Sequence, residues 1–440
     1  MEQPKPRNYH IKTYGCQMNE RDSETIAGVL AKRGMSPSAL TAADVIFVNT
    51  CTVRDKAEQK VFGFLGRLRE LKEANPDLVL GICGCMTQQQ AVAAKIKARF
   101  PYMDIIIGTH NLEQLDSYLD RVLQKRQRVL ELWKQRSEAE IQLPARRVGK
   151  YKAFVNINYG CNNFCSYCIV PYVRGREKSR TVQAIREEIQ ALIDEGYLEI
   201  TLLGQNVNSY GRDLPRKPDF ALLLKHVHAV QGLERIRFMT SHPRDVNERL
   251  IEALASLPKV CKHIHLPLQA GSNRILELMN RGYTREHFIS LTEQLRRDVP
   301  EISLTTDIIV GFPGETEADF AQTLAAVEKI RFDSAFTFMF SPRSGTPAAK
   351  MEGQLPLAEK RSRLQRLMET QNRISLELNQ QLIGTKQHVL VEEKAGKLFK
   401  GRTSGNKLVF VHSDGEITGK TVHVDITEAG TWNLAGRTEG

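Results

Sequence analysis

Three cysteines in one short loop constrain this chain more than any other feature. Cys161, Cys165 and Cys168 lie in the run GCNNFCSYCI (residues 160–169), with the spacing C-x3-C-x2-C. Thiolates at this spacing can bind three irons of a four-iron cluster, which leaves the fourth iron without a protein ligand. Because electron-transfer clusters usually have four cysteine ligands, the loop predicts a cluster whose open iron binds another molecule. A zinc loop is the alternative, although zinc sites favour C-x2-C pairs and four ligands.

Length and composition indicate the class of protein. A chain of 440 residues is too long for one ordinary core, so we expect two or three domains. The proportions of hydrophobic residues (41%) and charged residues (26%) are typical of a soluble globular protein. No apolar run approaches the ~20 residues that span a bilayer, and the N-terminus lacks the apolar core of a secretory signal. We therefore expect a cytoplasmic protein.

Cysteine usage and net charge indicate the chemistry and the partners. Eight cysteines are too few for a disulfide scaffold, and clustered thiols in a reducing compartment are metal ligands or catalysts. The net charge of +11 at pH 7 is typical of a protein with a polyanionic partner, because phosphate neutralisation is the general source of nucleic-acid affinity. Charge alone does not identify that partner.

Residues 1–125 alternate short apolar runs with amphipathic stretches. Strands separated by helices predict a parallel sheet that is covered on both faces. The charged connector that follows, residues 126–150, contains no clear strand. The strands are predicted at 9–14, 43–49, 78–82 and 104–107, and the helices at 20–33, 55–73 and 88–99.

Residues 151–375 continue the alternation with a longer period, and six βα units predict a barrel or a partial (β/α)6 barrel. Functional loops of such barrels lie at the carboxyl ends of the strands. The first strand ends directly at the three-cysteine loop, where this rule places the chemistry. The strands are predicted at 153–158, 199–203, 235–239, 263–268, 303–310 and 334–340.

The C-terminal part, residues 376–440, is predicted to be a small antiparallel β-barrel that follows a long helix over 356–384. Such barrels often bind single-stranded nucleic acid, and a purely structural β-cap is the alternative. Four basic residues favour RNA binding: Lys397, Lys400, Arg402 and Lys407. The strands are predicted at 387–391, 398–402, 407–411 and 421–426.

A second set of three cysteines occupies equivalent positions in the first segment. Cys16, Cys51 and Cys85 each follow one predicted strand. Loops at the carboxyl ends of neighbouring parallel strands converge, so these thiols can meet and bind one metal cluster. Gly15 and Gly84 let the backbone pass close to a bulky ligand. The alternative for each cysteine is a buried structural thiol.

Two further cysteines are interpreted as structural. Cys83 lies at the end of its strand, and Cys261 precedes the apolar strand at 263–268. A free cysteine is commonly a small buried hydrophobic residue. Cys83 nevertheless offers a second thiol beside the predicted ligand Cys85.

With these features, the chain resembles the methylthiotransferases of the radical S-adenosylmethionine (SAM) superfamily over essentially its whole length. The sequence YGCQMN at residues 14–19 resembles the branch that acts on N6-dimethylallyladenosine in tRNA, whereas the branches for threonylcarbamoyladenosine and for a ribosomal-protein aspartate differ there. The C-terminal segment resembles the TRAM domain. The resemblance is carried by residues 14–24, 49–54, 160–168, 170–180, 265–272 and 306–316.

The resemblance implies two 4Fe–4S clusters and SAM as cofactors. One cluster is assigned to Cys161, Cys165 and Cys168, and an auxiliary cluster to the second set. The implied reaction is methylthiolation of C2 of the prenylated adenosine at position 37 of tRNA, with SAM as radical source and as methyl donor. The implied partners are tRNA, through its anticodon loop, and an electron donor, and the chain is expected to act as a monomer. The ligands of the auxiliary cluster are Cys16, Cys51 and Cys85.

Six further residues are candidate contacts to SAM or to the target base, and each has a structural alternative. Tyr167 could instead fill the barrel mouth, and Gln205 and Asn206 could serve only in a turn. The residues from Gly311 to Glu315 could form a Gly-Pro turn that Thr316 caps. Arg174 could bind the SAM carboxylate or a tRNA phosphate, and its alternative is a place on a solvated charged face. The six candidates are Tyr167, Gln205, Asn206, Gly311, Glu315 and Arg174.

Two other functions stay open at this point. The chain could be a methylthiotransferase of the same architecture with another substrate, such as threonylcarbamoyladenosine tRNA or a ribosomal-protein aspartate. It could also be an RNA-binding iron–sulfur protein without catalysis. The three-cysteine loop with its open iron and the six βα units favour an enzyme.

Overall fold

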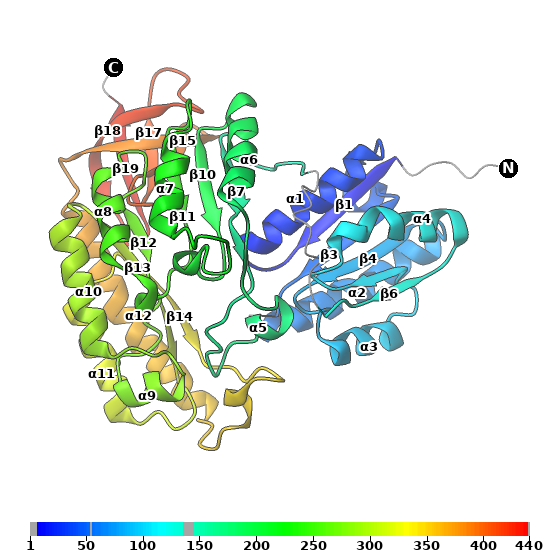
Figure 1. Ribbon diagram of the computed structural model, residues 1–440, viewed down its shortest axis with the longest axis horizontal. Coiled ribbons are helices and arrows are strands. Elements are labelled where there is room, and N and C mark those ends of the chain that lie inside the picture. Colours follow the sequence, from blue (N-terminus) through cyan, green and yellow to red (C-terminus); the bar gives the residue numbers. More distant parts are fainter. Residues whose placement is uncertain (1–6, 53–54, 135–144, 439–440) are drawn as a thin grey trace. The chain divides into compact units, whose positions relative to one another are not determined.

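The computed structural model describes residues 7–52, 55–134 and 145–438 (Figure 1), and the chain folds into two compact units. The first unit contains the described residues up to Val148 together with Tyr159–Asn162 and Ile169–Glu177. The second unit contains Gly149–Asn158, Asn163–Cys168 and the chain from Lys178 onward. Val53 and Arg54 of the 49–54 motif, and the 135–144 part of the connector, lie outside the described residues.

The first unit is built on a parallel sheet of six strands in its described residues, in the order β2-β1-β3-β4-β5-β6. The alternation of strands and helices therefore gives the sheet that the sequence predicts. The strands are β1 (Asn8–Thr13), β2 (Ser36–Pro37), β3 (Val45–Thr50), β4 (Val79–Gly84), β5 (Ile105–Ile107) and β6 (Val129–Glu131). The helices are α1 (Gln17–Lys32), α2 (Asp55–Ala74), α3 (Gln90–Arg99), α4 (Leu115–Lys125) and α5 (Val170–Val173), with short 3-10 turns η1 (Leu40–Ala42) and η2 (Leu112–Gln114).

Both faces of this sheet are covered, as expected for parallel strands. On one face Phe47 packs with residues of α1 and α4, including Leu30 and Leu119. On the other face Val48 packs with residues of α2 and α3, including Leu65 and Ile96 (Figure 1). Strands β3 and β4 are buried along their whole length.

Strand β6 corrects the prediction that the connector contains no strand. Val129–Glu131 pairs in parallel with β5, at the edge of the sheet. Only Val129 of its three residues is buried, so the segment has no apolar alternation to mark it. Its position depends on pairing with β5 rather than on a local pattern.

The second unit contains the six parallel strands that the sequence predicts. They form two three-stranded sheets, in the orders β11-β10-β7 and β12-β13-β14. An isolated parallel bridge pairs Ile236 of β11 with Val260, which precedes β12. The strands are β7 (Lys152–Asn156), β10 (Glu199–Leu203), β11 (Arg235–Phe238), β12 (His263–His265), β13 (Ser303–Val310) and β14 (Ser334–Met339). Two short strands flank the cysteine loop, β8 (Asn158–Tyr159) and β9 (Lys178–Ser179).

Helices cover these strands and share one apolar core with them. Five of the helices begin at a residue whose side chain accepts a hydrogen bond from the backbone N–H three residues later, which is the usual N-cap. Those caps are Thr181, Asp219, Asn247, Thr284 and Thr316. The helices are α6 (Val182–Asp194), α7 (Phe220–His228), α8 (Glu248–Ser256), α9 (Asn273–Leu278), α10 (Arg285–Asp298) and α11 (Glu317–Ile330), with 3-10 turns η3 (Val207–Ser209), η4 (Pro243–Asp245) and η5 (Pro347–Lys350).

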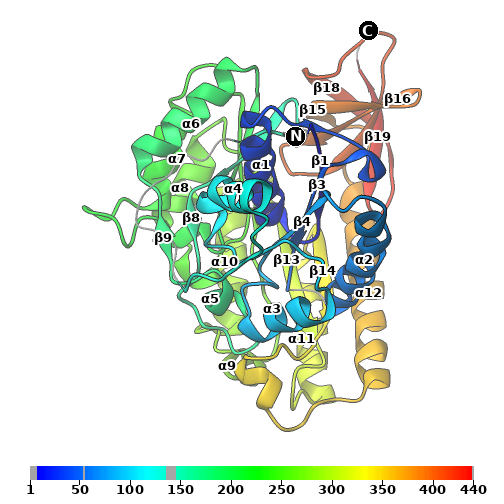
Figure 2. The ribbon, with the colours of Figure 1, turned by 90° about the vertical axis from the view of Figure 1, so that its right-hand side faces the viewer.

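Helix α12 (Leu357–Gln380) packs along β14 and α11 and leads into a closed barrel in the order β15-β16-β17-β19-β18 (Figure 2). All strand pairs of this barrel are antiparallel except β17 with β19, which is parallel. The sequence did not predict β19. The strands are β15 (Lys386–Ala395), β16 (Leu398–Thr403), β17 (Leu408–His412), β18 (Thr421–Ala429) and β19 (Asn433–Thr438). Within the described ranges, no helix has the length and apolar character needed to cross a membrane.

Candidate active site

The second set of cysteines, hereafter the N-terminal trio, lies at the carboxyl ends of adjacent strands. Cys16 follows β1 and is the N-cap residue of α1, Cys51 follows β3 directly, and Cys85 follows β4 directly. Strands β1, β3 and β4 are neighbours in the sheet. A Cβ atom on Gly15 would lie 2.8 Å from Cβ of Cys51, so the loop after β1 and the loop after β3 approach closely there. The structure therefore brings together the second set of cysteines.

The side chain of Asn19 joins these loops, and sequence reasoning gave it no role. Its amide group donates to the carbonyl oxygens of Tyr14 at 3.1 Å and Thr50 at 2.8 Å. Its Oδ1 atom lies 3.8 Å from Sγ of Cys16 and 4.0 Å from Sγ of Cys85. Asn19 is fully buried, and its amide oxygen lies near two of the three thiols, those of Cys16 and Cys85.

Arg174 also belongs to this group of residues. Its Nε atom donates to Sγ of Cys85 at 3.2 Å, and its Nη2 atom donates to Oδ1 of Asn19 at 3.0 Å and to Oδ2 of Asp22 at 2.8 Å. Burial raises the pKa of Cys85 to about 11, and the guanidinium of Arg174 opposes that rise. The contact of Arg174 with SAM stays a prediction, since the structure places its donors on Cys85, Asn19 and Asp22.

Cys83 and Cys261 lie among buried residues outside the two trios. Cys83 packs in the apolar core of the first unit, where burial raises the pKa of its thiol. Cys261 is also buried, and burial raises its pKa. Both are buried thiols, which fits the interpretation of each as a small buried hydrophobic residue.

In the second unit, the Asn163–Cys168 part of the three-cysteine loop is held by the end of α9 and the residues that follow it. Ser166 donates its N–H to the carbonyl of Met279 at 3.0 Å and its hydroxyl to that of Leu278 at 2.7 Å. The side chain of Asn280 donates to the carbonyl of Phe164 at 3.1 Å. These bonds hold the stretch that carries Cys165 and Cys168. Cys161 belongs to the first unit, where its N–H donates to the carbonyl of Gly175 at 3.2 Å.

A second buried arginine contacts this loop. The Nη1 atom of Arg281 donates to Sγ of Cys165 at 3.2 Å and to the hydroxyl of Tyr167 at 3.4 Å. Its Nε and Nη2 atoms donate to the hydroxyl of Tyr283 at 3.1 Å and to the carbonyl of Pro267 at 3.3 Å. Among the described residues Arg281 contacts no carboxylate. Sequence reasoning missed Arg281, because no local pattern indicates it.

Tyr167 takes the packing role that was its structural alternative. Its ring packs against an apolar cluster that includes Phe312 and Met279. Burial raises the pKa of its hydroxyl well above the usual value, so the hydroxyl is neutral and can donate a hydrogen bond. Its contact with SAM stays a prediction.

Gln205 and Asn206 follow β10 and leave two buried acceptors without a partner. The amide of Asn206 donates to Oδ2 of Asp245 at 2.6 Å. In the described chain, Oδ1 of Asn206 and Oε1 of Gln205 are buried and accept no hydrogen bond. Buried polar atoms normally have a partner, so these two oxygens fit a ligand that carries hydroxyl or ammonium donors, as SAM does.

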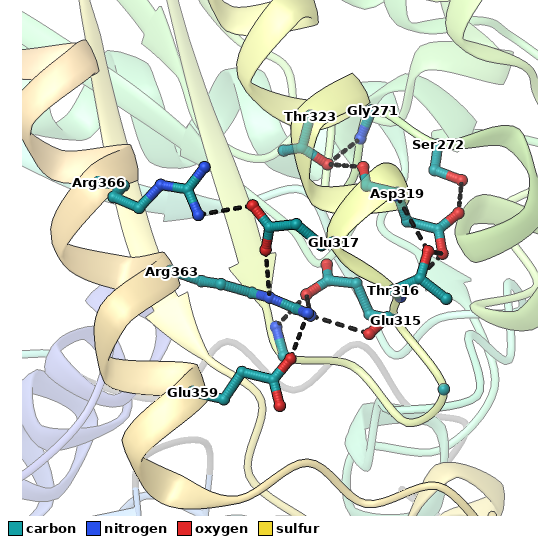
Figure 3. A network of polar contacts seen from close by, with 12 residues as sticks. Gly271, Ser272, Glu315, Thr316, Glu317, Asp319, Thr323, Glu359, Arg363 and Arg366 are labelled. Atoms are coloured by element: carbon teal, nitrogen blue, oxygen red, sulfur yellow. Dashed lines mark hydrogen bonds and ion pairs between the residues drawn. The ribbon is translucent and has the colours of Figure 1, made fainter.

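The turn from Gly311 to Glu315 is held by helix α12 (Figure 3). The N–H of Gly311 donates to Oε2 of Glu315 at 2.7 Å, and Arg363 contacts the same carboxylate oxygen at 2.7 Å. Thr316 caps α11 in a capping box with Asp319. The predicted Gly-Pro turn with Thr316 as the helix cap is therefore confirmed. The contacts of Gly311 and Glu315 with SAM stay predictions.

The basic residues of the C-terminal barrel make contacts within the protein. Lys400 pairs with Glu393 at 2.6 Å, Lys407 pairs with Asp333 at 2.6 Å, and Arg402 donates to the carbonyl of Asn406 at 2.9 Å. Lys397 is exposed. A more prominent surface feature is Trp432, whose side chain is 62% exposed between β18 and β19.

Both trios consist of free thiols alone, which are the usual ligands of iron–sulfur clusters. No three His, Cys, Asp or Glu side chains in the described ranges surround one point as the ligands of one ion would. A four-iron cluster is larger than one ion and separates the thiolates that bind it. A buried guanidinium at one sulfur of each trio also suits an anionic, thiolate-bound group.

Three family models match successive parts of the chain. The radical SAM superfamily matches residues 155–327, and the TRAM domain matches residues 380–438. The uncharacterized protein family UPF0004 matches residues 8–108, which carry Cys16, Cys51 and Cys85. The matched ranges follow the parallel-sheet part, the βα units and the closed barrel of the structure.

A solved structure supports the fold. The radical S-adenosylmethionine methyltransferase TsrM of Kitasatospora setae, with cobalamin and a 4Fe-4S cluster bound, superposes with a TM-score of 0.56 and 14% sequence identity. The superposition covers 94% of this chain and 82% of that chain. At this identity the likeness concerns the fold alone.

Curated relatives are similar along nearly their whole length. The tRNA-2-methylthio-N(6)-dimethylallyladenosine synthase of Carboxydothermus hydrogenoformans is 53% identical and covers 98% of this chain and 99% of its own. The synthase of the same name from Moorella thermoacetica is 54% identical over 98% of each chain. The chain belongs to the family of tRNA-2-methylthio-N(6)-dimethylallyladenosine synthases.

Proposed function

We propose that this protein methylthiolates C2 of N6-dimethylallyladenosine at position 37 of tRNA, with SAM as radical source and as methyl donor. The observation that carries the proposal is the pair of cysteine trios, each with one buried arginine at a sulfur. The full-length similarity to synthases named for this product supports the substrate. The radical SAM match over residues 155–327 supports the type of reaction.

We assign a 4Fe–4S cluster to each trio, one at Cys161, Cys165 and Cys168 and one at the N-terminal trio. A cluster of this kind, together with SAM, supplies an organic radical when both are bound. The protein's own residues bind and orient these groups. Arg281 and Arg174 donate to the ligand sulfurs, and Asn19 fixes the loops of the N-terminal trio.

SAM is assigned to the carboxyl ends of the barrel strands. The unpartnered oxygens of Gln205 and Asn206 can accept hydrogen bonds from the hydroxyl or ammonium groups of SAM. Asp245 orients the amide of Asn206 so that its oxygen stays available as the acceptor. These groups would bind and align SAM without reacting themselves.

We assign tRNA binding to the C-terminal barrel, because the TRAM match covers residues 380–438. Exposed Trp432 offers an aromatic surface for stacking of an unpaired base. A single-stranded anticodon loop suits the reaction, because C2 becomes accessible when the base leaves its stack. We also propose a division into residues 1–125, a connector at 126–150, a core at 151–375 and an RNA-binding domain at 376–440. We expect a cytoplasmic monomer that receives electrons from a separate donor.

The test is an anaerobic assay of the reconstituted protein with SAM, a strong reductant and tRNA that carries N6-dimethylallyladenosine. We expect 5′-deoxyadenosine and 2-methylthio-N6-dimethylallyladenosine by mass spectrometry. Replacement of the trio Cys161, Cys165 and Cys168 by alanine should abolish both products. Cys261→Ala is the matched control, because Cys261 is a buried cysteine outside both trios, and it should keep both products.

The two other functions give different results in the same assay. An RNA-binding protein without catalysis would bind tRNA and release no 5′-deoxyadenosine. A methylthiotransferase with another substrate would release 5′-deoxyadenosine and leave the prenylated adenosine unmodified. Either result would overturn the proposal.

A further inference from the structure

Each cysteine trio has one buried arginine that donates to a ligand sulfur at the same distance. Nε of Arg174 lies 3.2 Å from Sγ of Cys85, and Nη1 of Arg281 lies 3.2 Å from Sγ of Cys165. Both arginines are nearly fully buried, with 6% and 5% of their surface exposed. Water therefore does not screen either charge effectively.

The two arginines differ in what neutralises them. Arg174 forms an ion pair with Asp22 at 2.8 Å, and both side chains are buried. The other partners of Arg281 are neutral: the hydroxyls of Tyr167 and Tyr283 and the carbonyl of Pro267. In the part of the chain that the structure describes, no carboxylate contacts Arg281.

A buried cation without a counter-ion is strongly unfavourable. The anionic group that would lie beside Arg281 is the cluster at Cys165, because Nη1 of Arg281 donates to Sγ of Cys165 at 3.2 Å. Hydrogen bonds to the sulfurs and nearby charge are established determinants of cluster reduction potential. A positive charge stabilises the reduced cluster, which carries one more negative charge than the oxidised cluster.

We propose that Arg281 is a positioning residue whose charge and hydrogen bond to Sγ of Cys165 raise the reduction potential of the cluster at Cys161, Cys165 and Cys168. The Asp22–Arg174 pair gives the auxiliary cluster a hydrogen bond with no net added charge. This inference rests on the proposed function, because it requires a cluster at each trio. The two sites thus receive the same hydrogen bond in different electrostatic surroundings.

The first test measures the potential of the cluster at Cys161, Cys165 and Cys168 alone, in a background with Cys16, Cys51 and Cys85 replaced by alanine. A chemical reductant adds one electron to the cluster, no bond breaks, and the reduced form is followed by electron paramagnetic resonance. Arg281→Gln keeps a donor but removes the charge, and we expect a shift to a more negative potential. Arg281→Lys keeps the charge, and its cluster should have a reduction potential closer to that of the protein with an unmodified Arg281.

The second test removes the neutralising carboxylate of the other arginine. Asp22→Asn, measured with the Cys161, Cys165 and Cys168 trio replaced by alanine, leaves Arg174 uncompensated and should shift the auxiliary cluster to a more positive potential. Glu199→Gln is the matched control. Glu199 pairs with Arg237 at 3.0 Å, that pair is buried, and Arg237 donates to no cysteine of either trio. This control should move neither potential.

Iron and sulfide analysis separates the two levels of inference. One cluster, or none, in the unmodified protein would overturn the two-cluster function itself. Two clusters with an unmoved potential in Arg281→Gln would overturn only the role of Arg281. Loss of the cluster from Arg281→Gln but not from Arg281→Lys would support the counter-ion role. Loss from both variants would refute it, because lysine keeps the charge.

Discussion

At the residue scale, the side chain of Asn19 connects the backbone next to Cys16 and Cys51 and lies near two of the N-terminal thiols. Its amide donates to carbonyl groups of the loops after β1 and β3, and its oxygen accepts from Arg174 at 3.0 Å. Each loop carries one cysteine of the trio. A change at Asn19 therefore acts on the cluster site without removing a ligand.

Asn19→Ala should lower the free energy of unfolding of the cluster-free protein by about 2 to 3 kcal/mol, since the carbonyl of Tyr14 and the buried guanidinium of Arg174 each lose a hydrogen bond. It should also lower the iron content after reconstitution, because the thiol loops lose their shared anchor. Urea denaturation and iron analysis measure the two effects. Gln90→Ala, an exposed amide at the start of α3, is the control and should change neither quantity. An unchanged iron content in Asn19→Ala would contradict the anchoring role.

Gly84 is required by close approach as well as by backbone conformation. Its φ angle is +108°, and a Cβ atom would lie 2.3 Å from the carbonyl oxygen of Thr50. Gly34 has a φ angle of +82°, but a Cβ atom there would have no neighbour within 4 Å, so Gly34→Ala reports the conformational penalty alone. We expect Gly84→Ala to destabilise the protein by at least about 2 kcal/mol more than Gly34→Ala. If urea denaturation showed the same loss of free energy of unfolding for Gly84→Ala and Gly34→Ala, the close approach of Thr50 to Gly84 would not be the cause.

At the element scale, the start of α11 depends on an ionised carboxylate. Burial opposes ionisation of Asp319, but hydrogen bonds from Arg274, Ser272 and Thr316 outweigh it and hold the pKa of Asp319 below its usual range. A depressed folded-state pKa gives stability that is present above the unfolded-state value near 3.8 and is lost as the pH falls through the folded-state pKa.

The consequence is a pH-dependent contribution from one helix cap. Asp319→Asn should destabilise the protein at pH 7, and the difference from the unmodified protein should shrink as the pH falls below about 4. Chemical denaturation at pH 7 and at a pH below about 4 measures this difference in the free energy of unfolding. Asp194→Asn, which changes an exposed carboxylate at the end of α6, should have little effect at either pH. A difference that is the same at both pH values would exclude the ionised carboxylate as the cause.

The elements themselves were largely predictable, because strand and helix periodicity is local. The rule that loops meet at the carboxyl ends of parallel strands also located Cys16, Cys51 and Cys85 correctly in space. Strands β6 and β19 escaped prediction, since each is defined by its pairing with a neighbouring strand, β5 or β17, rather than by its own local pattern.

The supporting residues were not predictable, for a physical reason. Arg174 is 89 positions from Cys85, and Arg281 is 116 positions from Cys165. A hydrogen bond to sulfur has no spacing rule in the sequence. The charge of Arg174 predicts a contact with SAM or a tRNA phosphate, and that contact stays a prediction. The contacts of Arg174 with Cys85, Asn19 and Asp22 were not indicated by its charge.

At the scale of the whole chain, buried arginines of β11 attach the C-terminal barrel to the βα units within the second unit. Arg237 donates to the carbonyl groups of Ser404 at 3.0 Å and Thr403 at 2.9 Å. Arg235 donates to those of Arg402 at 2.8 Å and His388 at 2.9 Å. Strand β11 thus holds β15, β16 and the turn after β16, so a base stacked on the barrel is held relative to the βα units.

Trp432 gives this attachment a consequence for RNA binding. Stacking of a base on an aromatic side chain contributes about 1 to 3 kcal/mol by alanine substitution. Trp432→Ala should therefore weaken binding of an anticodon stem-loop roughly 10-fold or more, and Trp432→Phe should restore most of the loss. Fluorescence anisotropy at fixed salt measures the affinity, because phosphate contacts vary with salt.

The control separates base stacking from a general loss of apolar surface. Ile383 is 48% exposed and lies just after α12 in the same unit, so Ile383→Ala removes exposed apolar surface but no ring. Its affinity should equal that of the unmodified protein. If the loss for Trp432→Ala arose only from phosphate contacts, it would disappear at high salt, whereas a stacking contribution persists there. An affinity for Trp432→Ala equal to that of the control at every salt concentration would remove Trp432 from the RNA-binding surface.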